Sequence, residues 1–240
     1  MLPTVNADSM KIVNYSAEVT GRIDGVAAMP NLVPDADGRT ILINASSSIL
    51  SVTRTLLAAF TARVQFKELE YRIVFGKGKG VDRGFEGIVA EISQSARTSL
   101  PDRVTQNPDY RAIFPNGTDE FTTPTIRDDE EAATDLRTRL TGSNLREKDT
   151  FIGQLDAVIP VIRPAAQAVR TGELHINELA QQEMNARKAV IDTLWEQRRL
   201  VEIALGRGGK GLARFIFFDF RKSSGSDEPA APEPTTPPTP

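Results

Sequence analysis

Cysteine is absent from this chain of 240 residues, and histidine occurs only once, at His175. The missing thiols exclude disulfide scaffolds, thiolate metal sites and cysteine nucleophiles. A single imidazole excludes any catalytic or metal centre that takes two histidines from one chain. A di-metal bundle site needs Glu-x-x-His, and the residue three before His175 is Gly172. We therefore expect no metal, no cofactor and no enzymatic activity, and a surface or capping role for His175.

An excess of charge of one sign is also lacking. The chain has 29 Lys and Arg residues against 32 Asp and Glu residues, a formal net charge of −3. This balance predicts no polyanion partner bound through overall charge, and we predict no specific nucleic acid. The paired carboxylates at Glu68 and Glu70, and those at positions 128–131, are interpreted as solvated surface.

Long uninterrupted apolar runs are missing as well. The most apolar windows, near 41–60 and 157–169, contain Ser, Thr, Arg or Pro. Neither reaches the ~20 apolar residues that a membrane span requires. The first residues do not combine a basic region with an apolar run, so we expect no signal peptide. The sequence thus predicts a cytoplasmic protein with no transmembrane span.

Proline is concentrated at the C-terminal end, where six of the fifteen prolines fall in positions 223–240. This stretch has no large apolar side chain, and it cannot bury enough surface to offset the entropy of ordering. We expect a bundle domain over 1–222 and a disordered tail over 223–240. The tail serves either as a solubilising segment or as a polyproline ligand for a partner.

Helical periodicity dominates the rest of the chain. We expect a first helix capped by Asp8 or Ser9 that ends before Pro30. A second helix over about 40–75 carries an apolar residue every seven positions, at Ala45, Val52, Ala59, Phe66 and Ile73. Three glycines within positions 76–80 are expected to break this helix, because glycine is unfavourable inside helices. A third helix follows over about 81–99.

The second half predicts a similar series. Positions 101–124 contain four prolines and read as a connection that places Tyr110, Ile113 and Phe114 on the core. We expect Thr125 to cap a helix that ends at Gly142, and Asn144 with Glu147 to form a capping box. The helix after this box should be kinked or divided by Pro160 and Pro164 and should end at Gly172, and a last helix should span 173–205. Together the pattern predicts an all-α, elongated antiparallel helical bundle.

Both long helices are expected to end in a glycine-rich basic loop, at 76–80 and at 206–211. A duplicated helical hairpin explains the shared ending, and so does the general enrichment of Gly and Lys after helix ends. Neither loop meets the requirements of a P-loop or a dinucleotide motif. If the loops share one end of the bundle, they form an anion-binding patch, the alternative being solvated turns. The cations concerned are Lys77, Lys79, Arg83, Arg207, Lys210 and Arg214.

An aromatic segment over 212–220 holds four of the eleven phenylalanines. It is interpreted as a segment docked on the chain's own core, an oligomer or partner contact, or an interfacial anchor. The residues that would make an oligomer or partner contact are Phe215, Phe217, Phe218, Phe220 and Trp195.

The stretch from Tyr110 to Gly117 reads YRAIFPNG, followed by an acidic helix start and a long Arg- and Glu-rich helix. In this it resembles uncharacterised bacterial helical-bundle proteins that carry a Phe-Pro-x-Gly loop at this place. The resemblance implies a helical bundle and no activity.

These observations lead to one functional expectation and one alternative. The expected function is that of a non-enzymatic structural or interaction protein, a bundle that associates with itself or scaffolds another protein. The alternative is an anion-binding module for phosphate, a lipid headgroup or nucleic acid that uses the two basic glycine-rich loops.

Overall fold

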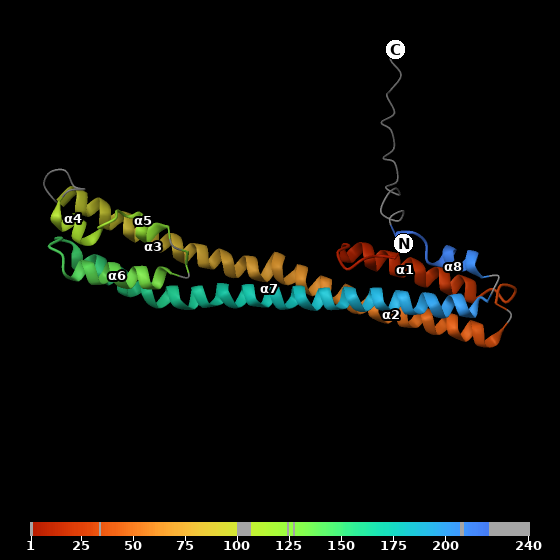
Figure 1. Cartoon of the computed structure of the whole chain (residues 1–240). Coiled ribbons are helices and arrows are strands. Elements are labelled where there is room, and N and C mark those ends of the chain that lie inside the picture. Colours follow the sequence, from red (N-terminus) through yellow and green to blue (C-terminus); the bar gives the residue numbers. More distant parts are fainter. Residues whose placement is uncertain are drawn as a thin grey trace, which may run out of the picture. The chain divides into compact units, whose positions relative to one another are not determined.

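The structure is a computed structural model that describes residues 2–33, 35–99, 107–123, 125–126, 128–206 and 209–220. The predicted all-α bundle is confirmed, because the described residues form helices and no strand (Figure 1). The predicted tail at 223–240 lies outside the described residues. The helices are α1 (Ser9–Ala27), α2 (Ala36–Gln65), η1 (Phe66–Glu70), α3 (Tyr71–Ser99), α4 (Pro108–Ile113), α5 (Asp119–Thr122), α6 (Asp129–Thr141), α7 (Lys148–Ala204) and α8 (Lys210–Ile216).

The chain divides into two compact units. Unit 1 comprises Met1–Ala62 and Leu179–Pro240, and unit 2 comprises Arg63–Glu178. The boundary falls inside two continuous helical stretches, α2–η1–α3 and α7. Each unit has its own apolar core, so each is described by itself.

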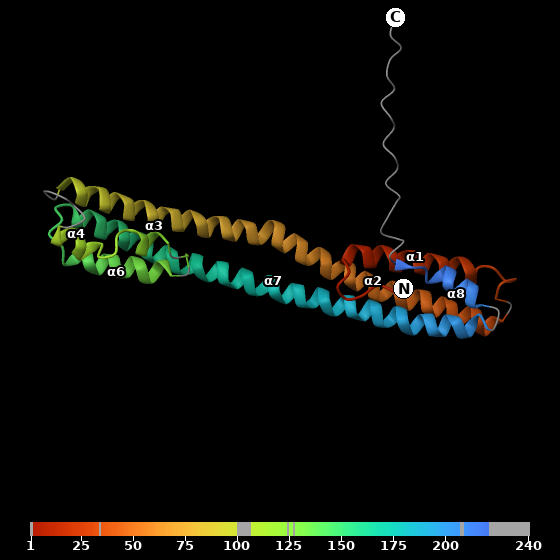
Figure 2. The same cartoon turned by 45° about the horizontal axis from the view of Figure 1, so that its top comes forward.

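Unit 1 packs α1, α8 and parts of α2 and α7 side by side, as both views of the ribbon show (Figures 1 and 2). Asp8 caps α1 as predicted, its carboxylate accepting a hydrogen bond from the Lys11 amide at 3.1 Å. The start of α2 lies beside the end of α7, because a Cβ at Gly38 would lie 3.2 Å from the Ala204 carbonyl oxygen. Residues of all four helices, such as Ile12, Leu42, Leu194 and Ile216, build the core.

A buried polar cluster ties the start of α1 to α7 within unit 1. The Ser9 hydroxyl donates to Glu183 Oε1 at 2.5 Å, and Arg187 Nε donates to the Ser9 oxygen at 2.6 Å. Arg187 also pairs with Glu183, whose side chain is almost fully buried. The buried carboxylate is therefore satisfied by both a hydroxyl and a guanidinium.

Unit 2 packs α3 and α7 against each other in antiparallel directions, with Tyr71 beside Gly172 and Gly78 beside Val169. The connection before α6 places Tyr110, Ile113 and Phe114 in the core, as predicted. Its two short helices are α4, capped by the Asn107 side chain, and α5. Gly117 follows Asn116 in the turn after α4 and has a φ of 85°, which only glycine adopts readily.

Two predicted helix breaks are wrong. Residues 76–80 lie inside α3, and Gly172 lies inside α7, a helix of 57 residues that also contains Pro160 and Pro164. The reason is tertiary packing. A Cβ at Gly78 would lie 2.8 Å from Val169 Cγ2, and a Cβ at Gly172 would lie 2.7 Å from Tyr71 Cδ2. Both glycines therefore let neighbouring side chains approach the helix backbone, and burial on this face outweighs the helix penalty.

The predicted seven-residue stripe fails at its last member. Ala45 is buried in the core of unit 1, whereas Ile73 is 53% exposed. Between them lies η1, a five-residue π-helix. A π-helical turn takes more residues than an α-helical turn, so it changes the phase of every residue that follows. The periodicity of α2 therefore does not continue into α3.

Two predicted caps are also wrong, and one is confirmed. The helix α6 begins at Asp129 with Asp128 as its N-cap residue, so Thr125 does not cap it. The long helix α7 begins at Lys148, four residues after the predicted cap Asn144. Gly142 is the C-cap residue of α6, as predicted.

The close approach at Gly172 gives a test of this packing. Gly172→Val inserts a branched side chain where the Tyr71 ring lies, and should lower the free energy of unfolding by about 1–3 kcal/mol. A control in the same helix is Gly153→Ala, where nothing lies within 4 Å of the new Cβ. That change should stabilise the protein by about 1 kcal/mol, because alanine is the better helix former. Urea denaturation followed by circular dichroism measures both. Equal stabilisation by both variants would contradict the packing of Tyr71 on Gly172.

Candidate interaction surfaces

The predicted anion-binding residues are divided between the two units. Lys77, Lys79 and Arg83 lie on α3 in unit 2, whereas Lys210 and Arg214 lie on α8 in unit 1. Arg207 lies outside the described residues. The first predicted loop is helical, so no pair of similar loops exists to support a duplicated hairpin. Helix α7 does end in a glycine turn, where Gly206 has a φ of 66°.

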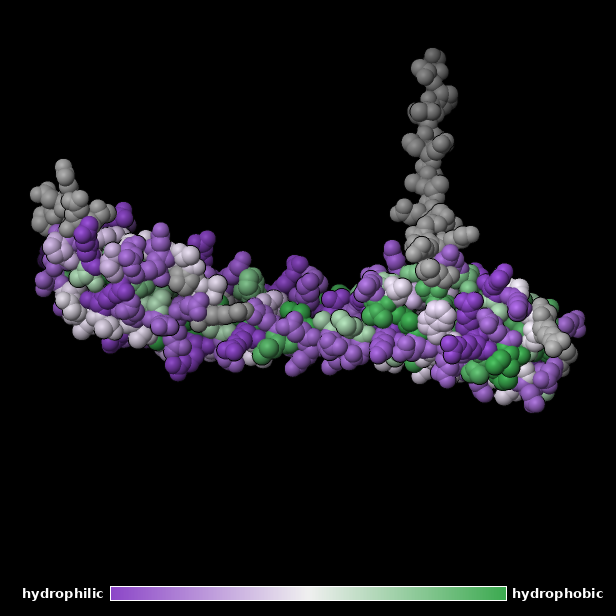
Figure 3. Space-filling model, in the orientation of Figure 1, coloured by the Kyte–Doolittle hydropathy of each residue, from purple (hydrophilic) through white to green (hydrophobic). Residues whose placement is uncertain are grey.

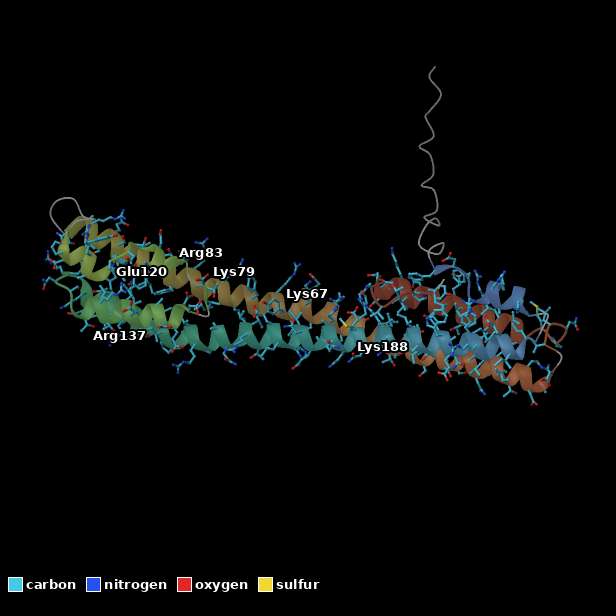
Figure 4. The ribbon with its side chains drawn as sticks, in the orientation of Figure 1. Lys67, Lys79, Arg83, Glu120, Arg137 and Lys188 are labelled. Atoms are coloured by element: carbon cyan, nitrogen blue, oxygen red, sulfur yellow. The ribbon has the colours of Figure 1, made fainter. Side chains whose placement is uncertain are left out.

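Two of these cations already have neighbours within the chain (Figure 4). The Lys79 ammonium lies 4.8 Å from the centroid of the Phe75 ring. Arg83 forms an ion pair with Glu86 at 2.6 Å. Both arrangements are exposed and therefore weak, so they leave the cations able to exchange partners. Anion binding by these residues stays a prediction.

The aromatic segment packs mainly on the chain's own core. Phe217 is buried, and the Tyr15 ring lies 4.8 Å from the Phe218 ring and 5.5 Å from the Phe220 ring. The Tyr15 hydroxyl donates to the Phe218 carbonyl oxygen at 3.0 Å, and burial raises the pKa of this hydroxyl. Phe215 remains about half exposed beneath the Arg22 guanidinium. The segment is thus a docked part of unit 1 with one exposed ring.

Trp195, the other residue predicted for a partner contact, lies on α7 in unit 1 with 49% of its surface exposed. A half-exposed tryptophan offers an anchor at a protein interface. Its role in a partner contact stays a prediction.

Helix α2 carries an exposed face that is almost free of charge. Of the eleven exposed residues in the range 41–62, only Arg54 is charged. The larger apolar side chains on this face include Ile43 and Leu57, which are 55% and 40% exposed. The space-filling view shows hydrophobic surface over the part of unit 1 that contains α2 (Figure 3). We call this set of exposed residues the α2 face.

The continuous stretch Ala36–Ser99, which begins with α2 and ends with α3, is the one described helical stretch that could cross a membrane by length and composition. Within Ala36–Ser99, an 18-residue window has a mean hydropathy of 1.3, and 33% of it is buried. The absence of a transmembrane span therefore stays a prediction, as does the cytoplasmic location.

Helix α3 carries a glycine-lined groove on the side of unit 2 that faces solvent. The groove has a volume of about 610 Å³. Three glycines of α3, Gly80, Gly84 and Gly87, line it together with apolar side chains and a few polar ones. The apolar members are Val81 and Ile88 from α3 and Ala157, Val158 and Val161 from α7. We call it the α3 groove. The sequence pattern placed Gly80 in a loop and Gly84 and Gly87 in a separate helix after it, and so missed the groove.

A pair of carboxyl groups lies between α3 and α6. Asp129, the first residue of α6, is fully buried. No N–H or hydroxyl group among the described residues donates a hydrogen bond to either of its carboxyl oxygens. Burial raises the pKa of Asp129 to about 7, helped by the charge of Asp82, by a hydrogen bond between the two carboxyl groups, and by Glu86 and Asp128. Two carboxyl groups can hydrogen-bond only while one of them is protonated. The prediction that positions 128–131 are all solvated is wrong for Asp129.

The other acids of this turn behave as predicted. Glu130 pairs with Arg163 across to α7, and this interaction lowers the pKa of Glu130. Negative charge at the start of α6 is favoured by the helix dipole, typically by 0.3–1 kcal/mol. The cost of burying an unpaired carboxylate is larger than this, which explains why the pKa of Asp129 is raised.

The described residues hold no group of three or more His, Asp or Glu side chains placed to bind a metal ion. Comparisons with family models, curated proteins and solved structures found no match for this chain.

The carboxyl pair predicts a pH dependence of stability. The folded state binds the Asp129 proton more tightly than the unfolded chain, whose pKa is 3.8. The contribution of Asp129 to the free energy of unfolding should therefore be greatest below pH 3.8, and should fall as the pH rises toward about 7. Asp129→Asn should flatten this slope and raise the free energy of unfolding at pH 8 by about 1–3 kcal/mol.

The exposed neighbour Asp128 provides the control. Asp128→Asn removes one negative charge from the same turn without relieving a buried carboxylate, so the slope should persist. Urea denaturation at several pH values measures all three proteins. An unchanged slope in Asp129→Asn would show that another group titrates.

Proposed function

We propose that this chain is a non-enzymatic structural protein that associates with itself through the α2 face. One observation carries the proposal: the eleven exposed residues of 41–62 include a single charged side chain, in a chain that is 25% charged overall. Six of the other ten are Ser, Thr or Asn and four are Ile, Leu or Ala, so the face is uncharged rather than wholly apolar. Depletion of charged residues is characteristic of the centre of protein interfaces.

The spacing of the α2 face supports a second copy as the occupant. Ile43, Leu50 and Leu57 are seven residues apart, which places them on one stripe of the helix. Ile43 and Leu57 belong to the α2 face, and Leu50 between them is half-buried. The stripe is symmetric about Leu50, so an antiparallel copy sets Leu50 against itself and Ile43 against Leu57. This is the arrangement of a two-fold interface, in which one patch serves both copies.

The single charge on this face does not oppose such pairing. In the antiparallel arrangement Arg54 of one copy lies level with Ser46 of the other. The two Arg54 side chains are then about 12 Å apart along the helix axis, at 1.5 Å per residue. Their repulsion is therefore weak, because each guanidinium can reach water.

Packing of the adjoining face of α2 favours a partner helix over a lipid bilayer. Leu42, Ile49 and Leu56 are fully buried in the core of unit 1. This core also contains α1, whose other faces carry the charged residues Lys11, Glu18 and Asp24 at exposed positions. A helix covered on one side by such a neighbour needs cover only on the other side.

The proposal is tested by placing charge on the stripe. The double variant Ile43→Lys/Leu57→Lys should raise the dissociation constant of the dimer about a hundredfold, because each copy loses two apolar contacts and gains two repelling charges. Size-exclusion chromatography with light scattering over a range of concentrations measures the change.

Two controls accompany this test. Ile203→Lys charges an apolar side chain that is 71% exposed on α7 of the same unit, and should leave the dimer intact. Flotation of the wild-type protein with neutral lipid vesicles tests the membrane alternative. A wild-type protein that is monomeric at high concentration, or one that floats with the vesicles, would contradict the proposal.

A further inference from the structure

The α3 groove has a feature that the fold of unit 2 does not explain. Gly76, Gly80, Gly84 and Gly87 all lie within α3, and a Cβ at any of them would meet no atom within 4 Å. None of the four has a positive φ. Each glycine inside a helix costs roughly 1 kcal/mol relative to alanine. Neither backbone conformation nor packing within the chain therefore requires these glycines, in contrast to Gly78.

Glycines on a helix surface allow the backbone of another helix to approach closely. In the α3 groove the glycines alternate with the larger apolar residues Val81 and Ile88. The glycines leave holes in the helix surface, and the side chains of Val81 and Ile88 project from it. A helical partner with the opposite order of holes and projections would fill the groove.

The chain itself has that opposite order when α3 is reversed. If an antiparallel copy is centred on Gly84, residues whose numbers sum to 168 lie level along the axis. Ile88 then lies level with Gly80 of the second copy, and Val81 lies level with its Gly87. Each projection is thus level with a position that has no side chain.

One pair of opposite charges on α3 agrees with the same register, whereas the two Arg83 side chains of the groove would lie about 3 Å apart along the axis. Lys77 lies level with Glu91 of the second copy, and both side chains are exposed. Glu91 belongs to the groove, and from the part of the chain that the structure describes it receives a long hydrogen bond of 3.4 Å from Gln154. A parallel copy would instead set Lys77 against Lys77 and Ile88 against Ile88. Charge and shape therefore both favour the antiparallel arrangement.

We propose that the α3 groove is a second two-fold interface, in which α3 of another copy of this chain docks antiparallel about Gly84. The inference rests on the proposed self-association but uses a different surface, in unit 2. A helix laid into an apolar groove is a common mode of recognition, and here the groove and the helix come from the same segment.

The absence of cysteine makes a direct test simple, because one introduced thiol is the only thiol in the protein. Gly84→Cys sets two thiols across the two-fold axis, and mild oxidation should give a disulfide-linked dimer. Gly80→Cys should link poorly, since its two copies are about 12 Å apart along the axis, beyond the 4.4–6.8 Å Cα separation of a disulfide. Gly25→Cys, at an exposed glycine of α1, measures random collisions.

The cross-linking is done in the Ile43→Lys/Leu57→Lys background, so that association through the α2 face does not contribute. Strong linkage at position 84 alone supports the inference. Equal linkage at 84 and 80 would overturn the antiparallel register. Linkage at 84 no greater than at 25 would overturn the groove contact, while the light-scattering result for the α2 face would still decide the proposed function separately.

A charge exchange tests the register without altering a glycine. Lys77→Glu or Glu91→Lys alone should weaken association in the same background by about two- to thirtyfold, because the two-fold dimer contains two such exposed ion pairs. The double variant Lys77→Glu/Glu91→Lys should restore it, because the pair is re-formed with reversed signs. If the two residues act independently, the double variant should associate no better than the single variants. That result would overturn the register.

Discussion

Close packing of the Tyr71 ring on the backbone at Gly172, together with Val169 on Gly78, determines how unit 2 is built. Side chains of α3 and α7 reach the opposite backbone only because these two positions lack a Cβ. The same contacts keep both helices continuous through segments that contain glycine and proline. Burial of apolar surface along the contact outweighs local penalties of about 1 kcal/mol per glycine. The remaining helices of unit 2 complete the core around this pair.

Features of the fold that depend on neighbouring residues could be predicted from the sequence. The Asp8 cap, the Gly142 helix end and the turn at Gly117 each follow from chemistry within a few residues. Features that depend on distant contacts could not. Whether Gly78 breaks a helix or admits a side chain depends on Val169, which is far away in the sequence. The π-helix η1 has no composition signal of its own, so the loss of the stripe at Ile73 was equally hidden.

The same distinction applies to the candidate surfaces. The basic residues of α3 were visible in the sequence, but the role of the glycines between them was not. Gly78 is buried and Gly80 is exposed, and only the positions of Ile126 and Val169 separate the two cases. The lack of charge over 41–62 was readable, yet it is equally typical of a core helix. Its meaning changed only when the structure showed which of these residues remain exposed.

The buried carboxyl of Asp129 also changes the meaning of the net charge. The formal value of −3 counts every Asp and Glu as ionised. With a pKa of about 7 for Asp129, the folded chain carries a proton that the unfolded chain has already released at neutral pH. Folding near pH 6 therefore takes up hydrogen ions from the buffer, and the heat of folding must include the ionisation enthalpy of whichever buffer supplies them. The net charge of the folded protein near pH 6 is therefore slightly less negative than its composition implies.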